Sequence, residues 1–88
     1  MKTLKTGLYR HYRGNYYIVK GIGTHTETLE KQVEYFFVEK PQEMWHRPLE
    51  MFLETINING KEVNRFEFIR GINFPTRDWS FAIPDELK

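Results

Sequence analysis

Arginine and aromatic residues lie close together in several parts of the sequence. The arginines are Arg10, Arg13, Arg47 and Arg65, and their aromatic neighbours are Tyr9, Tyr12, Tyr16, Trp45 and Phe66. A guanidinium group forms paired hydrogen bonds with phosphate or carboxylate, and aromatic rings stack on bases or on arginine itself. The combination predicts a surface that binds a ligand or partner. The alternative is that arginine–aromatic stacks and ion pairs with the seven glutamates of residues 21–60 stabilise the fold.

Three further residues could bind a metal ion. His25 and Glu27 are two positions apart, so they would project from the same face if a strand continued through them. Together with His11 they would supply two imidazoles and one carboxylate. In the alternative interpretation, Glu27 caps backbone N–H groups of a loop and the histidine rings are hydrogen-bonded. No other cofactor is expected.

The segment Trp45-His46-Arg47-Pro48 has two interpretations. An exposed indole ring could form one wall of a binding pocket for a cation or a proline-rich peptide. Alternatively, Trp45 belongs to the core and Pro48 begins a helical turn, where its missing N–H costs nothing.

Nucleophilic catalysis has little support in the sequence. The chain contains no cysteine, which excludes a thiolate nucleophile, a thiolate zinc site and a disulfide framework. Its single serine, Ser80, has no Gly-x-Ser-x-Gly context, and the glycines around Ile22 do not form a phosphate-binding loop. We therefore expect a binding module and not an enzyme.

Length and charge limit the classes of protein further. The chain has 88 residues and a formal net charge of +1, which fits one domain with no strongly basic or acidic character. It has no apolar run long enough to span a membrane and no apolar stretch at its start. The sequence therefore predicts a cytoplasmic protein that has no membrane partner.

Most of the chain has the alternating, β-branched and aromatic pattern of short strands. The expected strands are residues 7–12, 16–22, 32–38, 44–47, 54–58 and 61–69. Asn59-Gly60 is a strong signal for a two-residue hairpin turn, which would pair Ile58 with Lys61 and Ile56 with Val63. Gly21 and Gly23 indicate a bulge near the end of the second strand.

The expected fold is all-β, a small SH3-like, partly open barrel. It would contain five or six short antiparallel strands, with one helical turn near residues 48–53; an OB-type barrel is the second choice. Residues 6–69 would form the domain. Residues 70–88 combine Gly71, Pro75 and Pro84 with several aromatics, and we expect an ordered extension that packs on the barrel or on a partner chain. A homodimer is one possible outcome.

Four blocks of sequence resemble a known family. They are residues 9–14 with Tyr16, residues 25–30, the segment Trp45 to Phe52, and Arg65-Phe66. These blocks are similar in type and order to those of the DUF1653 family. The resemblance covers most of the chain and implies a compact β domain of about this length. It implies no activity, but it directs attention to the residues within the four blocks.

The candidate ligand or partner residues share these blocks. They are Tyr9, Arg10, His11, Tyr12, Arg13, His25, Glu27, Trp45, Arg47 and Arg65. The expected partner is a protein, a peptide, a nucleic acid or a nucleotide. The alternative function is a small metal-binding protein or enzyme centred on His11, His25 and Glu27.

Overall fold

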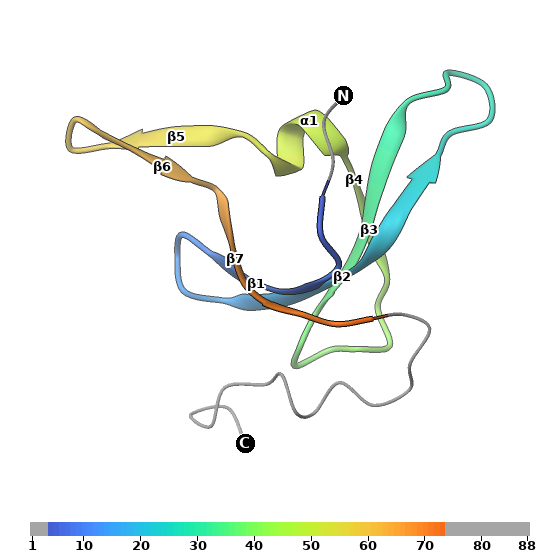
Figure 1. The fold of residues 1–88 in the computed structure, drawn as a ribbon, viewed down its shortest axis with the longest axis horizontal. Helices are drawn as coiled ribbons and strands as arrows, with labels where there is room; N and C mark the ends of the chain where they lie inside the picture. Colours follow the sequence, from blue (N-terminus) through green and yellow to red (C-terminus); the bar gives the residue numbers. More distant parts are fainter. Residues whose placement is uncertain (1–3, 74–88) are drawn as a thin grey trace.

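The structure is a computed structural model that describes residues 4–73, and this part of the chain is mostly β (Figure 1). Seven strands and one short helix follow one another along the chain. They are β1 (Gly7–His11), β2 (Tyr16–Thr24), β3 (Lys31–Phe37), β4 (Trp45–Pro48), α1 (Leu49–Phe52), β5 (Thr55–Ile58), β6 (Lys61–Asn64) and β7 (Phe66–Gly71). The predicted all-β class is confirmed.

The strands form one main sheet and one small one. The main sheet has five antiparallel strands in the order β4-β3-β2-β1-β7, and β5 pairs with β6 in a separate ribbon. In Figure 1 this ribbon, called the arm below, extends away from the main sheet. The strands of residues 4–73 do not close into a barrel. Assignment to the SH3-like class stays a prediction.

The last predicted strand is in fact two strands. The sequence predicts continuous strand over residues 61–69, but the structure has β6, then Arg65 outside both sheets, then β7. The Arg65 N–H donates to the Glu54 carbonyl oxygen at 3.0 Å, and its own carbonyl accepts from the Tyr12 N–H at 2.9 Å. The chain therefore passes from the arm to the main sheet within one residue.

Two expectations about local structure are confirmed in the arm and in β2. Asn59 and Gly60 both have positive φ (52° and 83°), as a type I′ turn requires, and the register pairs Ile58 with Lys61. In β2 the register with β3 shifts between Val19 and Gly21, which is the predicted bulge. Because the bulge adds one residue to β2, odd-numbered residues before it and even-numbered residues after it project from the same face of the sheet.

The main sheet is covered by apolar side chains on both faces. One face carries the buried residues Tyr9, Val19, Val33, Tyr35 and Phe66 with Leu49 and Phe52 of α1, and we call it the aromatic face. The other face carries the buried residues Leu8, Ile18, Phe36 and Ile72. Because successive side chains of a strand alternate, each strand contributes to both clusters.

Helix α1 closes part of the aromatic face. Pro48 precedes it with φ of −53°, and the buried residues Leu49 and Phe52 are three positions apart on one side of the turn. The Phe52 ring stacks on the Phe66 ring with centroids 4.1 Å apart, and it meets Tyr9 and Tyr35 edge-on. The predicted Pro48-initiated turn is confirmed.

Most of the predicted extension, residues 70–88, lies outside the described residues. Its first two residues belong to β7, and Ile72 is buried, with its N–H donating to the Thr6 carbonyl oxygen at 3.2 Å. The boundary of the domain and the homodimer stay predictions. No helix of residues 4–73 has the length and apolar character needed to cross a bilayer.

Candidate functional site

Three arginines from different parts of the chain lie around His11. Arg13 lies in the turn after β1, Arg47 in β4 and Arg65 between β6 and β7. Burial lowers the pKa of His11 below its usual value, and the positive charges of Arg65, Arg13 and Arg47 lower it further. We call these four residues the arginine cluster. The cluster concentrates positive charge at one end of the aromatic face.

Hydrogen bonds hold two of the guanidinium groups in place. The Arg13 Nε donates to the Tyr12 hydroxyl at 3.0 Å, and the guanidinium lies 5.5 Å from the centre of that ring. The Arg47 Nε donates to the Tyr35 hydroxyl at 3.2 Å. Both bonds use Nε and leave the terminal nitrogens available. Within residues 4–73, no carboxylate forms an ion pair with Arg13 or Arg47.

Arg65 differs because it has an acidic partner. Its Nη2 lies 3.0 Å from the Glu54 Oε1, in a partly exposed ion pair. Its Nε is buried and has no hydrogen-bond partner. A buried donor without a partner costs free energy, on the order of 1–3 kcal/mol. An acceptor atom that reached this Nε would remove that cost.

The local contacts of His11 favour its neutral form, in line with its lowered pKa. The N–H of Arg13 donates to His11 Nδ1 at 3.2 Å, so this nitrogen acts as an acceptor. The ring packs against Tyr12 with centroids 4.5 Å apart and meets Phe66 edge-on at 4.9 Å. A neutral ring at this position adds no charge to the three arginines around it.

A row of partly exposed rings continues from the cluster across the main sheet. We call it the aromatic row, and its members are Tyr12, Tyr17, Phe37 and Trp45. The Tyr17 ring lies 6.3 Å from His11 and 5.5 Å from Phe37, centre to centre. Trp45 is 51% exposed and lies 6.5 Å from the buried Tyr35 ring. The row therefore crosses neighbouring strands, with ring surface open to solvent.

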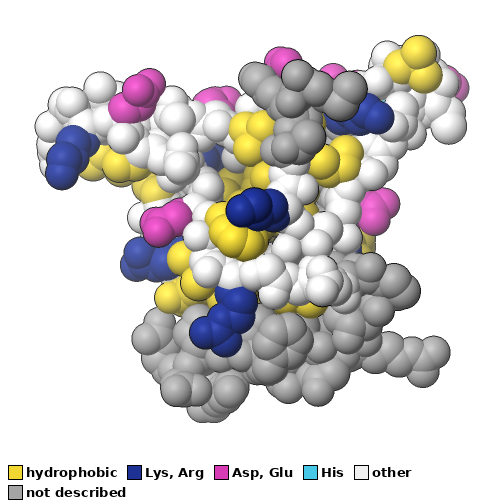
Figure 2. Space-filling view, viewed as in Figure 1, with side chains coloured by type: hydrophobic (Ala, Val, Ile, Leu, Met, Phe, Trp, Pro, Cys, Tyr) yellow, Lys and Arg dark blue, Asp and Glu magenta, His cyan; other side chains and the backbone are white. Residues whose placement is uncertain are grey.

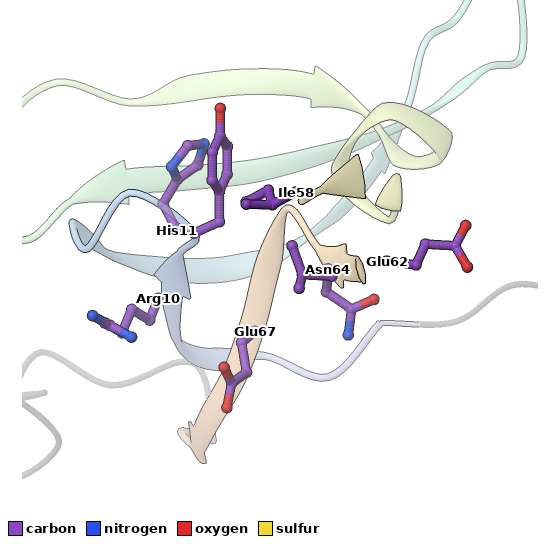
Figure 3. A pocket seen from close by; sticks show the side chains of 8 residues that line it. Arg10, His11, Ile58, Glu62, Asn64 and Glu67 are labelled. Atoms are coloured by element: carbon purple, nitrogen blue, oxygen red, sulfur yellow. The ribbon is translucent and has the colours of Figure 1, made fainter. Parts of the chain in front are cut away.

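A groove of about 440 Å³ lies beside the cluster, between β1 and the arm. Its lining is Arg10, His11, Tyr12, Ile58, Glu62, Val63, Asn64 and Glu67. Figure 3 shows His11 at the end of β1 and Ile58, Asn64 and Glu62 on the arm, whereas the Arg10 side chain extends from β1 away from the arm. In Figure 2, hydrophobic side chains lie along the side of the arm that faces the main sheet. His11 of the arginine cluster and Tyr12 also line this groove, which in addition carries the carboxylates of Glu62 and Glu67.

The structure brings together only some of the predicted residues. His11, Tyr12, Arg13, Arg47 and Arg65 converge, and Trp45 lies at the far end of the aromatic row. The other four predicted residues lie elsewhere in the fold.

Tyr9 and Arg10 do not join the arginine cluster. Tyr9 is buried in the core, its hydroxyl donates to the Lys5 carbonyl oxygen at 2.6 Å, and burial raises its pKa to about 12. Arg10 is exposed and follows the same alternation as Leu8, so it belongs to the opposite face of β1. Neither position offers a group to a ligand on the aromatic face.

His25 and Glu27 lie at the opposite end of β2 from His11. β2 ends at Thr24, so no strand continues through His25 and Glu27, and nine residues of strand, roughly 25–30 Å, separate them from His11. His25 Nδ1 accepts from the N–H groups of Glu27 and Thr28 at 3.3 Å each and so organises the loop. Residues 4–73 contain no group of three side chains placed to hold a metal ion.

The structure contradicts the interpretation of Trp45 as a core residue, because its side chain is half exposed. Sequence reasoning also missed Tyr17, Tyr35 and Phe37 as parts of the site. The signal that could have found them is strand alternation: Tyr17 pairs with Phe37, and Tyr35 pairs with Trp45, so all four share one face.

A His11→Gln variant is expected to lose less stability in acid than the parent protein. Because the pKa of His11 is lowered in the folded state, the unfolded chain takes up the proton first as pH falls through 6.5. The free energy of unfolding therefore decreases below that pH and levels off below the folded pKa, whereas glutamine does not titrate. Urea unfolding at about pH 7.5 and about pH 5.5 measures the difference. Equal losses in the two proteins would contradict this account of His11.

Fold and site together define a class of protein: a small, mostly β domain whose sheet carries an arginine cluster beside a row of partly exposed rings. Residues 7–68 match a family model described as a protein of unknown function, DUF1653. The chain belongs to the DUF1653 family, as the sequence resemblance implied.

A solved structure agrees with this assignment. The crystal structure of a DUF1653 protein from Bordetella bronchiseptica is 28% identical in sequence and superposes with a TM-score of 0.68. The match covers 83% of this chain and 96% of that chain. A comparison with curated proteins gives no match. All four residues of the arginine cluster lie within the segment that matches the family model.

Proposed function

We propose that this domain is a non-catalytic binding module whose ligand places an anionic group in the arginine cluster. One observation carries the proposal: Arg13, Arg47 and Arg65 converge on His11 from three separate parts of the chain. Glu54 balances only the charge of Arg65, so the positive charge of Arg13 and Arg47 favours a bound phosphate or carboxylate. Catalysis is not part of the proposal.

The supporting geometry is that of a preformed site. Tyr12 and Tyr35 fix the guanidinium groups of Arg13 and Arg47 through their Nε atoms. Ordering a long side chain before binding reduces the entropy that the complex must lose. If these arginines served only the fold, we would expect carboxylate partners, as Arg65 has in Glu54.

Pyrophosphate is expected to raise the pKa of His11, and NMR can observe this directly. An anion among the three arginines offsets the charges that, after burial, lower that pKa, so the midpoint of the His11 titration should rise. The ring signals of His11 are followed against pH in pyrophosphate and in chloride at equal ionic strength. His25, beyond the far end of β2, is the internal control: adding pyrophosphate at constant pH should leave its ring signals in place.

Two variants make this experiment specific. Arg47→Gln removes one charge of the cluster and should greatly reduce the response of His11 to pyrophosphate. Arg10→Gln removes the same charge from the opposite face of β1 and should leave the response intact. A His11 midpoint that pyrophosphate does not move, or that moves equally in both variants and the parent, would refute an anion site in the cluster.

A further inference from the structure

The aromatic row extends the proposed anion site over a distance that a single small anion would not fill. Its rings follow β1 or belong to β2, β3 and β4, which are neighbours in the main sheet. Neighbouring strands are about 4.8 Å apart, so the row spans roughly 14 Å. A ligand that used the whole row would therefore be several ring widths long.

Two guanidinium groups of the arginine cluster lie beside rings of this face. Arg13 lies over the Tyr12 ring, and Arg47 reaches the Tyr35 hydroxyl beside Trp45. Glu34 precedes Tyr35 on β3, but its side chain points to the opposite face of the sheet. There its Oε1 lies 3.6 Å from the His46 Nε2. Rings and guanidinium groups thus share one face.

We propose that the ligand is a single-stranded nucleic acid, with bases stacked on the aromatic row and backbone phosphates at Arg13 and Arg47. This inference rests on the proposed anion site and names the ligand class for it. Four-stranded sheets with exposed rings bind two or three unstacked bases in this way, and such stacking tolerates any base. A duplex keeps its base faces internal and would leave the row unused.

An acidic peptide fits the same surface less well. Its carboxylates would satisfy the arginines but would leave Phe37 and the half-exposed Trp45 without a partner for their ring faces. The adjoining groove is lined by Glu62 and Glu67 against the single cation Arg10, so its net negative charge repels a polyanion. The strand is therefore expected to lie across the sheet and not to enter the groove.

Titration of a short oligo(dT) labelled with fluorescein tests the proposal on the full chain. Trp79, outside the described residues, is first replaced by Phe so that intrinsic fluorescence reports Trp45 alone. We expect a rise in anisotropy together with quenching of Trp45. Two neutralised phosphates give a slope of about −1.4 for log affinity against log salt concentration.

Each class of variant should change a different quantity. Trp45→Ala should lower the affinity about tenfold without changing the salt slope, because it removes one stacking platform. Arg47→Gln should lower the affinity and make the slope less steep by about 0.7, because one phosphate contact is lost. Arg10→Gln changes the net charge equally but lies on the other face, so affinity and slope should be retained.

The outcomes separate the two proposals. If oligo(dT) does not bind, or binds no better than polyglutamate of equal charge, while pyrophosphate still shifts the His11 titration, the nucleic-acid inference is overturned and the anion site stands. If neither probe binds, both fail. If oligo(dT) binds but Trp45→Ala, Arg47→Gln and Arg10→Gln all behave like the parent, the strand binds elsewhere and the inference is overturned.

Discussion

A Phe52→Ala variant is expected to lose about 4 kcal/mol of unfolding free energy, most of what a domain of this size possesses. The Phe52 side chain is 1% exposed, and its ring touches those of Tyr9, Tyr35 and Phe66. Its removal leaves a cavity where α1 packs against these three rings. Urea unfolding followed by circular dichroism measures the loss.

Met51→Ala is the matched control for this variant. Met51 is the preceding residue of the same helix but is 46% exposed, so truncation there should change stability by less than about 0.5 kcal/mol. If Phe52→Ala lost no more than Met51→Ala, packing of α1 on the aromatic face would not be a main source of stability.

A Gly7→Ala variant should be destabilised by about 3 kcal/mol. Gly7 begins β1 with φ of +145°, a conformation that residues with a side chain rarely adopt. A Cβ atom there would also overlap the Arg70 carbonyl oxygen and approach the Gly71 Cα of β7. Because both obstacles are backbone atoms, β1 and β7 would have to separate at this point.

Gly21→Ala supplies the comparison for Gly7→Ala. A Cβ atom at Gly21 would meet nothing within 4 Å, and the position has no unusual φ. Alanine there should leave thermal stability close to that of the parent protein. A melting temperature for Gly7→Ala that matched that of Gly21→Ala would contradict the close pairing of β1 and β7 at Gly7.

Short sequence signals correctly predicted the turn of the arm and the start of α1, because both depend on the backbone preferences of one or two residues. Asn59-Gly60 has the positive φ angles that set the register of the arm, and Pro48 begins α1. The break at Arg65 was not predictable in this way. Alternation continues through residues 61–69, and the separation into β6 and β7 depends on pairing with β1, which is more than fifty residues away in sequence.

The candidate site was predictable in its chemistry but only partly in its membership. Residue types indicated Arg13, Arg47 and Arg65 as candidate ligand-binding groups, and all three lie near enough to His11 to lower its pKa. Sequence spacing could not show that β2 places His25 at the far end of the sheet. Nor could it show that Tyr9 would face the core, because both faces of β1 carry apolar residues.

Arg65 makes the geometry of the arm and the charge of the cluster interdependent. Its backbone joins Glu54 at the base of the arm to Tyr12 beside β1, and its side chain forms an ion pair with the same Glu54. An anion that drew the guanidinium away from Glu54 would break one contact that holds the arm in place. By the reciprocity of coupled equilibria, a change in the position of the arm would alter the affinity for the anion by the same free energy. A substitution of Arg65 would change both at once, so its effect on binding cannot be separated from its effect on shape. Arg13 and Arg47 lack this second role, so substitutions there test the proposed anion binding without changing the arm.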